Sequence, residues 1–174
     1  MAEEMNIYED ITAYGKAYSR LWEHVQENPD QFPSGSISVG TIAEYYAKKF
    51  LEEKHRGSRV SFGRANEKSW DIQVLSINGE KTLYQVKSIS LFNKTRKLSP
   101  LVEGFDSLIV ISMDCEFMPF QVYLFEDSKV LFGENKVTAL TVPNPENKRQ
   151  RGSEVFLSAK NIHHEFFELL SNKL

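Results

Sequence analysis

Apolar residues in the first part of the chain recur at helical spacing. Between Tyr8 and Val25 they fall three or four positions apart, which predicts an amphipathic helix with one apolar face: Ile11, Tyr14, Tyr18, Leu21, Trp22 and Val25. Helix-breaking residues follow at 28–30 and 33–36. A second helix is predicted from Val39 or Thr41 to Glu53, with Ser38 or Thr41 as its N-cap.

The pattern changes to strands after a polar, basic segment at 55–69. Asp71–Ile77 and Leu83–Ile89 flank an Asn78-Gly79 turn and predict a β-hairpin. Two further apolar runs predict strands at Ser107–Met113 and Phe120–Phe125. A short strand at Arg59–Phe62 would add a fifth.

The end of the chain returns to helical spacing. Residues 142–152 read as a loop, and a closing helix is predicted from Ala159 to Asn172, burying Ile162, Phe166, Phe167, Leu169 and Leu170. The sum is an α/β protein with a central mixed four- to five-stranded sheet flanked by helices. We expect one domain over 1–174: an N-terminal helical segment at 1–35, a core at 36–127, and a C-terminal loop and helix at 128–174.

Composition narrows the class of protein. A chain of 174 residues buries a core without covalent staples, and its single cysteine, Cys115, excludes an internal disulfide and a thiolate zinc cluster. Residues 1–4 lack the layout of a secretory signal, and no apolar run approaches the length of a membrane span. We therefore expect a cytoplasmic protein that does not enter a membrane.

The net charge of −3 bears on the partner. It argues against a protein that coats nucleic acid without sequence preference, because such binding depends on neutralising phosphates. It is compatible with a nuclease, since a metal site needs acidic residues and a local basic strip can still guide DNA.

The hairpin concentrates the polar residues that could carry chemistry. Gln85 and Lys87 share one face of the returning strand. A two-residue turn would place Asp71 opposite Val86, on the other face, whereas a three-residue loop at 78–80 places it opposite Lys87. A site shared by these side chains therefore requires a loop of odd length or one bulge.

Asp71, the hairpin and the segment Gln85-Val86-Lys87-Ser88 resemble the core of the PD-(D/E)xK superfamily of nucleases, in the variant with Gln in place of the second acidic residue. The helix segment 40–45, which contains Glu44, resembles the element that precedes this core in the family. The resemblance covers about 40–125, and the residue before Asp71 is Trp70, so the Pro-Asp pair is absent. It implies a restriction-endonuclease-like core.

The resemblance also implies a catalytic role for each residue. The catalytic set is Asp71, Gln85, Lys87 and Glu44. Mg²⁺, for which Mn²⁺ could substitute, would be held by Asp71, Gln85, the Val86 carbonyl and Glu44. Lys87 would orient or help to deprotonate the attacking water. The implied activity is magnesium-dependent hydrolysis of DNA phosphodiester bonds, of restriction or genome-defence type, by a chain that acts as a homodimer.

Basic and polar residues near this core are candidate contacts to DNA. They are Arg64, Asn66, Lys68, Ser88, Lys94, Arg96 and Lys97. Each has a plainer alternative: the loop residues keep loops soluble, Ser88 packs in the strand, and Glu44 forms a helix-surface ion pair with Lys48. The rival functions are a DNA-binding module that does not cut and a partner subunit built on the same fold. RNA remains an alternative substrate.

Overall fold

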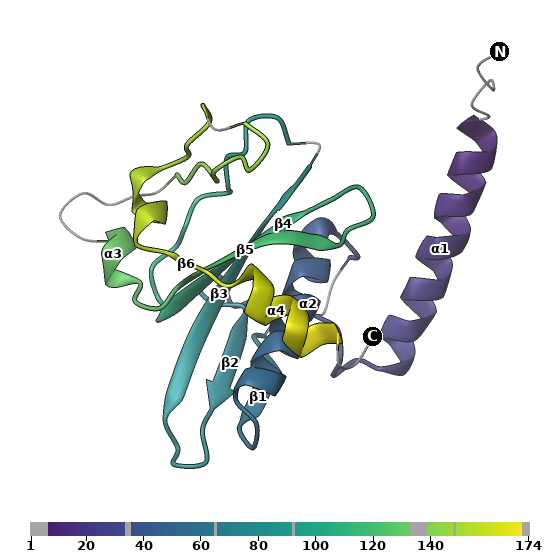
Figure 1. Ribbon diagram of the computed structural model, residues 1–174. Helices are drawn as coiled ribbons and strands as arrows, with labels where there is room; N and C mark the ends of the chain where they lie inside the picture. The colour runs from purple at the N-terminus through teal and green to yellow at the C-terminus, as the bar shows by residue number, and fades with distance from the viewer. Residues whose placement is uncertain are drawn as a thin grey trace.

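The computed structural model describes residues 7–33, 36–64, 66–91, 93–132, 139–147 and 149–171. The N-terminal residues 1–6 and the helix-breaking residues 34 and 35 lie outside these ranges, as does the side chain of Ile11. Figure 1 shows a central sheet with helices against it and one long helix standing apart.

A six-stranded sheet forms the centre of the molecule, with the strands in sequence order. Neighbouring strands are antiparallel except β3 and β4, which run parallel. The strands are β1 (Arg59–Phe62), β2 (Ile72–Leu75), β3 (Lys81–Ser90), β4 (Ser107–Met113), β5 (Pro119–Phe125) and β6 (Lys160–Asn161). The sheet is wider than the four to five strands predicted, because β6 joins its edge with only two residues and so leaves no alternating pattern in the sequence.

The helices are α1 (Ile7–Glu27), α2 (Val39–Lys54), α3 (Lys129–Phe132) and α4 (His163–Ser171), with a short 3₁₀ helix at Glu154–Leu157. The predicted cap of α2 is confirmed. The Ser38 side chain accepts a bond from the Thr41 amide, and the Thr41 side chain accepts one from the Ser38 amide. Both amides would otherwise lack partners at a helix start. The cap fixes where α2 begins relative to the sheet.

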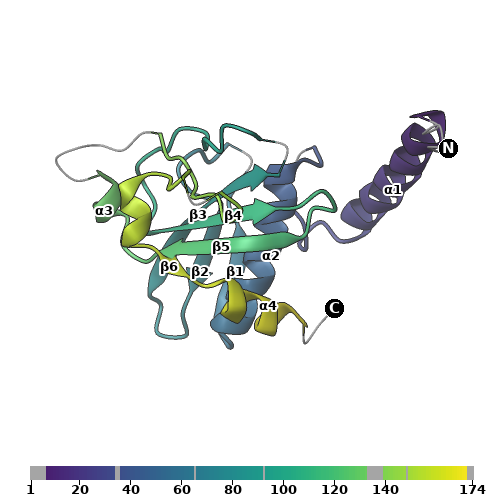
Figure 2. The same cartoon turned by 45° about the horizontal axis from the view of Figure 1, so that its top comes forward.

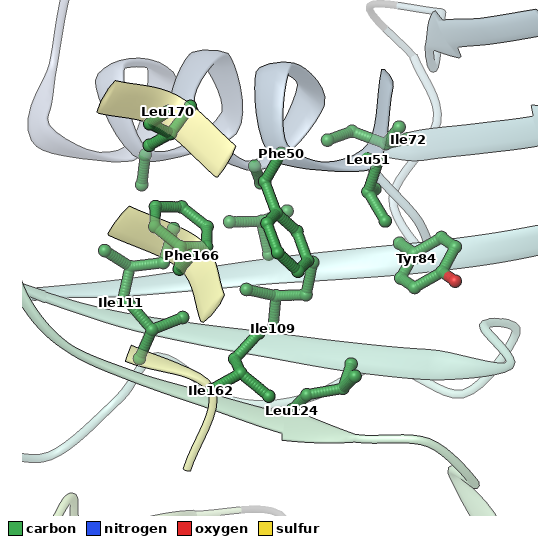
Figure 3. Close-up of a cluster of buried hydrophobic side chains, with 14 of the residues drawn as sticks. Phe50, Leu51, Ile72, Tyr84, Ile109, Ile111, Leu124, Ile162, Phe166 and Leu170 are labelled. Carbon is green, nitrogen blue, oxygen red and sulfur yellow. The ribbon is translucent and has the colours of Figure 1, made fainter. Parts of the chain in front are cut away.

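One hydrophobic core lies between the sheet and the two helices α2 and α4. Phe50 of α2 and Phe166 of α4 stack with ring centroids 4.8 Å apart, and both are fully buried. Figure 3 shows these rings above Ile109, Ile111 and other sheet residues. Every residue of β4 is buried, because both faces of this central strand are covered.

A second core covers the opposite face and includes the connection from β3 to β4. Parallel neighbours require a crossover. Here residues 91–106 make it, and their described part, 91 and 93–106, contains no helix. Leu98, Leu101 and Phe105 pack from this connection against Leu108 and Val110 of β4. The crossover connection is therefore anchored to the sheet by its own apolar residues.

The helix α1 projects away from the sheet in both views (Figures 1 and 2). The sequence predicted its amphipathic pattern, yet Tyr14 and Trp22 are 66% and 51% exposed. Tyr18 is also exposed and lies near Tyr14, with ring centroids 6.1 Å apart. The apolar face predicted for this helix is thus largely uncovered within one chain.

The hairpin between β2 and β3 has a three-residue loop, as a shared site requires, but one position earlier than predicted. Leu75 pairs with Lys81, and the Gly79 amide donates to the Ser76 carbonyl. The loop is therefore 77–79, with Gly79 in the left-handed conformation that favours glycine (φ 83°). The paired register ends at Ile72 and Tyr84, and the Asp71 amide donates to the Tyr84 carbonyl, so Asp71 is not paired with Lys87 as the later loop predicted.

In the ranges that the structure describes, no helix has the length and apolar character that crossing a membrane requires.

Candidate active site

The second half of β3 has an edge that β2 does not pair. The register between the two strands ends at Ile72 and Tyr84, whereas β3 continues to Ser90 and pairs with β4 throughout. At this open edge the Asp71 carboxylate accepts a 2.7 Å hydrogen bond from the Val86 amide. A side chain thus takes the place of the missing strand. In a strand the amide and carbonyl of one residue point to the same edge, so the Val86 carbonyl faces it too.

Gln85 is the most deeply buried polar residue of this region, with 2% of its surface exposed. Its amide nitrogen donates a 3.1 Å hydrogen bond to the Ser69 carbonyl. Its amide oxygen is buried and has no hydrogen-bond partner. A buried polar atom without a partner costs about 1–3 kcal/mol, so it indicates a group that is satisfied by something else.

Glu44 brings a second carboxylate from α2. Burial, and after it the negative charge of Asp71, raise the pKa of its carboxyl to about 8, although the Lys87 ammonium opposes both effects. Glu44 is therefore close enough to feel both charges. The alternative pairing with Lys48 is not formed, because the Lys48 ammonium bonds Glu52 instead.

The pKa values of Asp71 and Lys87 also reflect burial and each other's charge. Burial raises the pKa of Asp71, while the bond from the Val86 amide and the nearby Lys87 lower it. Burial lowers the pKa of the Lys87 amine, and the carboxylates of Asp71 and Glu44 oppose that shift. Three ionisable groups, from α2, from the residue before β2 and from the middle of β3, thus act on one another, although none is exposed like a surface charge.

These residues fit a hard divalent cation. The oxygens available are the two carboxylates, the unpaired amide oxygen of Gln85 and the Val86 carbonyl, which is the donor set that magnesium prefers. No cluster of three or more histidine, cysteine, aspartate or glutamate side chains occurs in the described part of the chain. The set therefore depends on a neutral amide and a backbone oxygen as well as on acids.

Most of the predicted DNA contacts lie in two connections beside this site. Arg64, Asn66 and Lys68 are exposed between β1 and β2, and Lys94 and Lys97 are exposed in the crossover connection. Ser88 is half-buried in β3 and, by strand alternation, points to the face opposite Lys87. The exposed residues and Ser88 stay predictions.

Arg96 requires a correction, because it is only 5% exposed. Its guanidinium donates to the carbonyls of Val142 and Pro143 and to the side chains of Ser112 and Gln121, at 2.9–3.3 Å. These bonds hold the segment 141–143 to the sheet. Arg96 is thus a structural residue, and a contact between it and DNA is not expected.

Three residues that the sequence did not single out contact the site. Ser69 holds the Gln85 amide through its backbone carbonyl, and the Glu67 carboxylate accepts bonds from the Lys68 and Ser69 amides and the Ser69 hydroxyl at 2.7–3.1 Å. Ser99 of the crossover connection lies 3.1 Å from the Lys87 amine. No sequence motif marks these residues, because their role depends on how two loops fold against β3.

Among the comparisons with known proteins, the one with solved structures gives matches. No family model matches the sequence, and no curated protein matches it. Ten chains of solved structure match, among them a bacterial homing endonuclease, I-Ssp6803I, at 19% sequence identity and a TM-score of 0.47. The match covers 77% of this chain and 94% of that chain. A TM-score below 0.5 does not establish a shared fold, so the site is interpreted from its own geometry.

Proposed function

We propose that this chain is a metal-dependent endonuclease that hydrolyses DNA phosphodiester bonds. The observation that supports the proposal is the mutual influence of the Asp71, Lys87 and Glu44 charges, with Asp71 bonded at the open edge of β3. The buried amide oxygen of Gln85, which has no protein partner, adds to that support. The order of these residues along the chain and their placement on a helix and a hairpin support the PD-(D/E)xK resemblance.

Each residue has a distinct part in the proposed site. Asp71 is held by the Val86 amide at the open edge, and Gln85 has a buried amide oxygen without a protein partner, which would serve as a second ligand. When bound there, Mg²⁺ or Mn²⁺ would polarise the phosphate and lower the pKa of a coordinated water. Glu44 would share in holding the cation, whose positive charge would favour the ionised form of its carboxyl.

Lys87 acts on the attacking water and on the charge of the phosphate. Its burial favours the neutral amine, which can accept a proton from water, and its ammonium form stabilises the negative charge that develops on the phosphate oxygens. The Ser99 hydroxyl, 3.1 Å away, fixes where the amine lies. Exposed Arg64, Lys68, Lys94 and Lys97 flank the site from two connections and are proposed to contact the DNA backbone.

Plasmid cleavage with Mg²⁺ or Mn²⁺ tests this function. We expect the wild-type chain to cut and Lys87→Met to lose at least about a hundredfold in rate, which is the size of effect typical for one general acid–base group. Lys81→Met is the matched control, because Lys81 is an exposed lysine at the start of the same strand. It should cut like the wild type.

The rival functions give different results in the same assay. A wild-type chain that retains DNA in a gel-shift assay without cutting it, with either cation, would favour a binding module. Neither binding nor cutting would favour a partner subunit. Equal loss of activity in Lys81→Met and Lys87→Met would show that cleavage depends on the total positive charge of the chain and not on Lys87 in the proposed site. A restriction or genome-defence role, and a choice of DNA over RNA, are parts of the proposal that substrate comparison would test.

A further inference from the structure

Gln85 is anchored by a turn in the connection between β1 and β2. The Gln85 amide nitrogen donates to the carbonyl of Ser69, which lies in the connection between β1 and β2. That bond decides which end of the amide faces the carbonyl. The amide oxygen is then the end of the amide that stays buried and without a partner.

The turn that carries the Ser69 carbonyl is held from two sides. One oxygen of the Glu67 carboxylate accepts bonds from the Lys68 amide, the Ser69 amide and the Ser69 hydroxyl. From the other side, Gly104 of the crossover connection approaches so closely that a Cβ there would lie 2.7 Å from the Ser69 Cβ. Gly104 has φ +125°, a conformation that side chains rarely adopt. The position of the carbonyl is therefore built into the fold.

A carboxylate at position 85 would not be compatible with this anchor. The Ser69 carbonyl is an acceptor, and an ionised glutamate has no hydrogen to donate to it. Two acceptors would then face each other in a buried place, with neither satisfied. The environment of position 85 thus selects an amide, although an extra negative charge would by itself attract a divalent cation more strongly.

We propose that Glu67 and Ser69 form a positioning turn for Gln85, and that this turn makes a neutral amide oxygen the cation ligand at position 85. The inference rests on the proposed metal site. It implies that Gln85→Glu, which would restore the acidic residue more usual in the resembled motif, weakens the site instead of improving it. It also gives Glu67 a role through Gln85 and not through contact with the cation.

Hydrogen exchange of the Gln85 side-chain amide tests the turn without any metal. In EDTA, the side-chain amide signals of the full chain are measured by NMR and assigned by their loss in Gln85→Leu. We expect slow exchange in the wild type and in Glu67→Gln, which keeps an acceptor oxygen. Exchange at least ten times faster is expected in Glu67→Ala. Equal exchange rates in the two Glu67 variants would overturn the positioning role.

Calorimetric titration with Mn²⁺ tests the choice of ligand. We expect Gln85→Glu to bind Mn²⁺ at least ten times more weakly than the wild type, with a circular dichroism spectrum that shows an intact fold. Equal or tighter binding would overturn the inference. If Gln85→Glu does not fold, the two Glu67 variants test the inference in its place. Glu67→Ala should then bind more weakly than Glu67→Gln, whereas equal affinities would assign the effect to the lost charge and contradict the proposal.

The two measurements separate this inference from the proposed function. A wild-type chain that binds no Mn²⁺ would overturn the metal site, and with it the choice of ligand, whereas amide exchange would still decide the turn. A chain that binds Mn²⁺ but does not cut DNA would contradict the nuclease activity alone.

Discussion

Glu44 is the residue whose environment departs most from that of an ordinary surface acid. It lies on a helix, yet its carboxyl is buried and next to a second carboxylate, and its pKa is about 8. A carboxyl held in this way is costly to ionise until a positive charge arrives. Such strongly shifted groups are typical of functional sites. The residue therefore provides a measurable property of the site that does not require substrate.

The pH dependence of stability follows from that shift. The folded carboxyl has a pKa of about 8 against 4.5 for the unfolded value, so between these values the folded chain binds a proton that the unfolded chain releases. Stability therefore falls as pH rises from about 5 to 8, by up to about 1.4 kcal/mol per pH unit. Unfolding in EDTA at several pH values should show this fall in the wild type and a smaller one in Glu44→Gln.

The matched control is Glu80→Gln, an exposed residue directly after the hairpin loop, which should keep the wild-type slope. Asp71, whose pKa is also raised, remains in every variant and adds a slope of the same sign. The lowered pKa of Lys87 acts in the opposite direction at higher pH, below the usual value of 10.5. A Glu44→Gln slope equal to that of the wild type would show that Glu44 is not the group responsible.

Among the elements, the crossover connection between β3 and β4 has the most varied role. It supplies apolar residues to the second core, Ser99 to Lys87, Gly104 to the turn at Ser69, and the buried Arg96 to the segment 141–143. An irregular connection can do this only if its own position is fixed. The bonds of Arg96 are the strongest candidates for fixing it, because they join this connection to two other parts of the chain.

Arg96→Met is expected to destabilise the fold and not to act on DNA directly. The substitution keeps much of the apolar stem but leaves the carbonyls of Val142 and Pro143 without donors, a loss of about 2–5 kcal/mol. Thermal unfolding should show a lower midpoint than in Lys94→Met, an exposed position of the same connection. An Arg96→Met chain that unfolds like the wild type yet binds DNA more weakly would contradict the structural role.

The elements differ in how far the sequence could predict them. The bounds of β4 and the cap of α2 were predictable, because a continuous apolar run and a Ser38–Thr41 pair are local signals. The hairpin loop was placed one residue late, since only the chain's φ angles decide which residue of a glycine-containing loop is left-handed. The roles of Ser69 and Arg96 could not be predicted from the sequence. Ser69 acts through its backbone carbonyl, which every residue type has. Arg96 is buried while its basic neighbours are exposed, and that difference depends on tertiary packing.

At the scale of the whole molecule, α1 packs less of its apolar surface against the rest of the chain than the other long helices do. The helix α4 is already used against α2, whereas α1 leaves Tyr14, Tyr18 and Trp22 exposed along one side. An amphipathic helix gains most of its stability from covering such a face. In the proposed function, two copies would also supply one site for each strand of DNA. We therefore propose that two copies of the chain pair through α1.

Light scattering coupled to gel filtration tests this pairing. The wild type should have twice the mass of one chain, and Trp22→Glu should run as a single chain because a charge would then lie in the apolar contact. Ile77→Glu, which changes another exposed apolar residue at the hairpin tip, should keep the wild-type mass. A wild-type chain that is monomeric at all concentrations would contradict the proposal.

The open edge of β3 has a consequence for solubility. An unpaired strand amide is a template on which another strand can add, and proteins usually protect such edges from aggregation. The Asp71 carboxylate accepts the hydrogen bond of the Val86 amide. It therefore blocks the addition of another strand at this edge, besides being a candidate metal ligand. Replacing Asp71 by alanine removes both roles, whereas asparagine keeps an acceptor oxygen. Asparagine is therefore the substitution that separates loss of catalysis from self-association of the exposed strand.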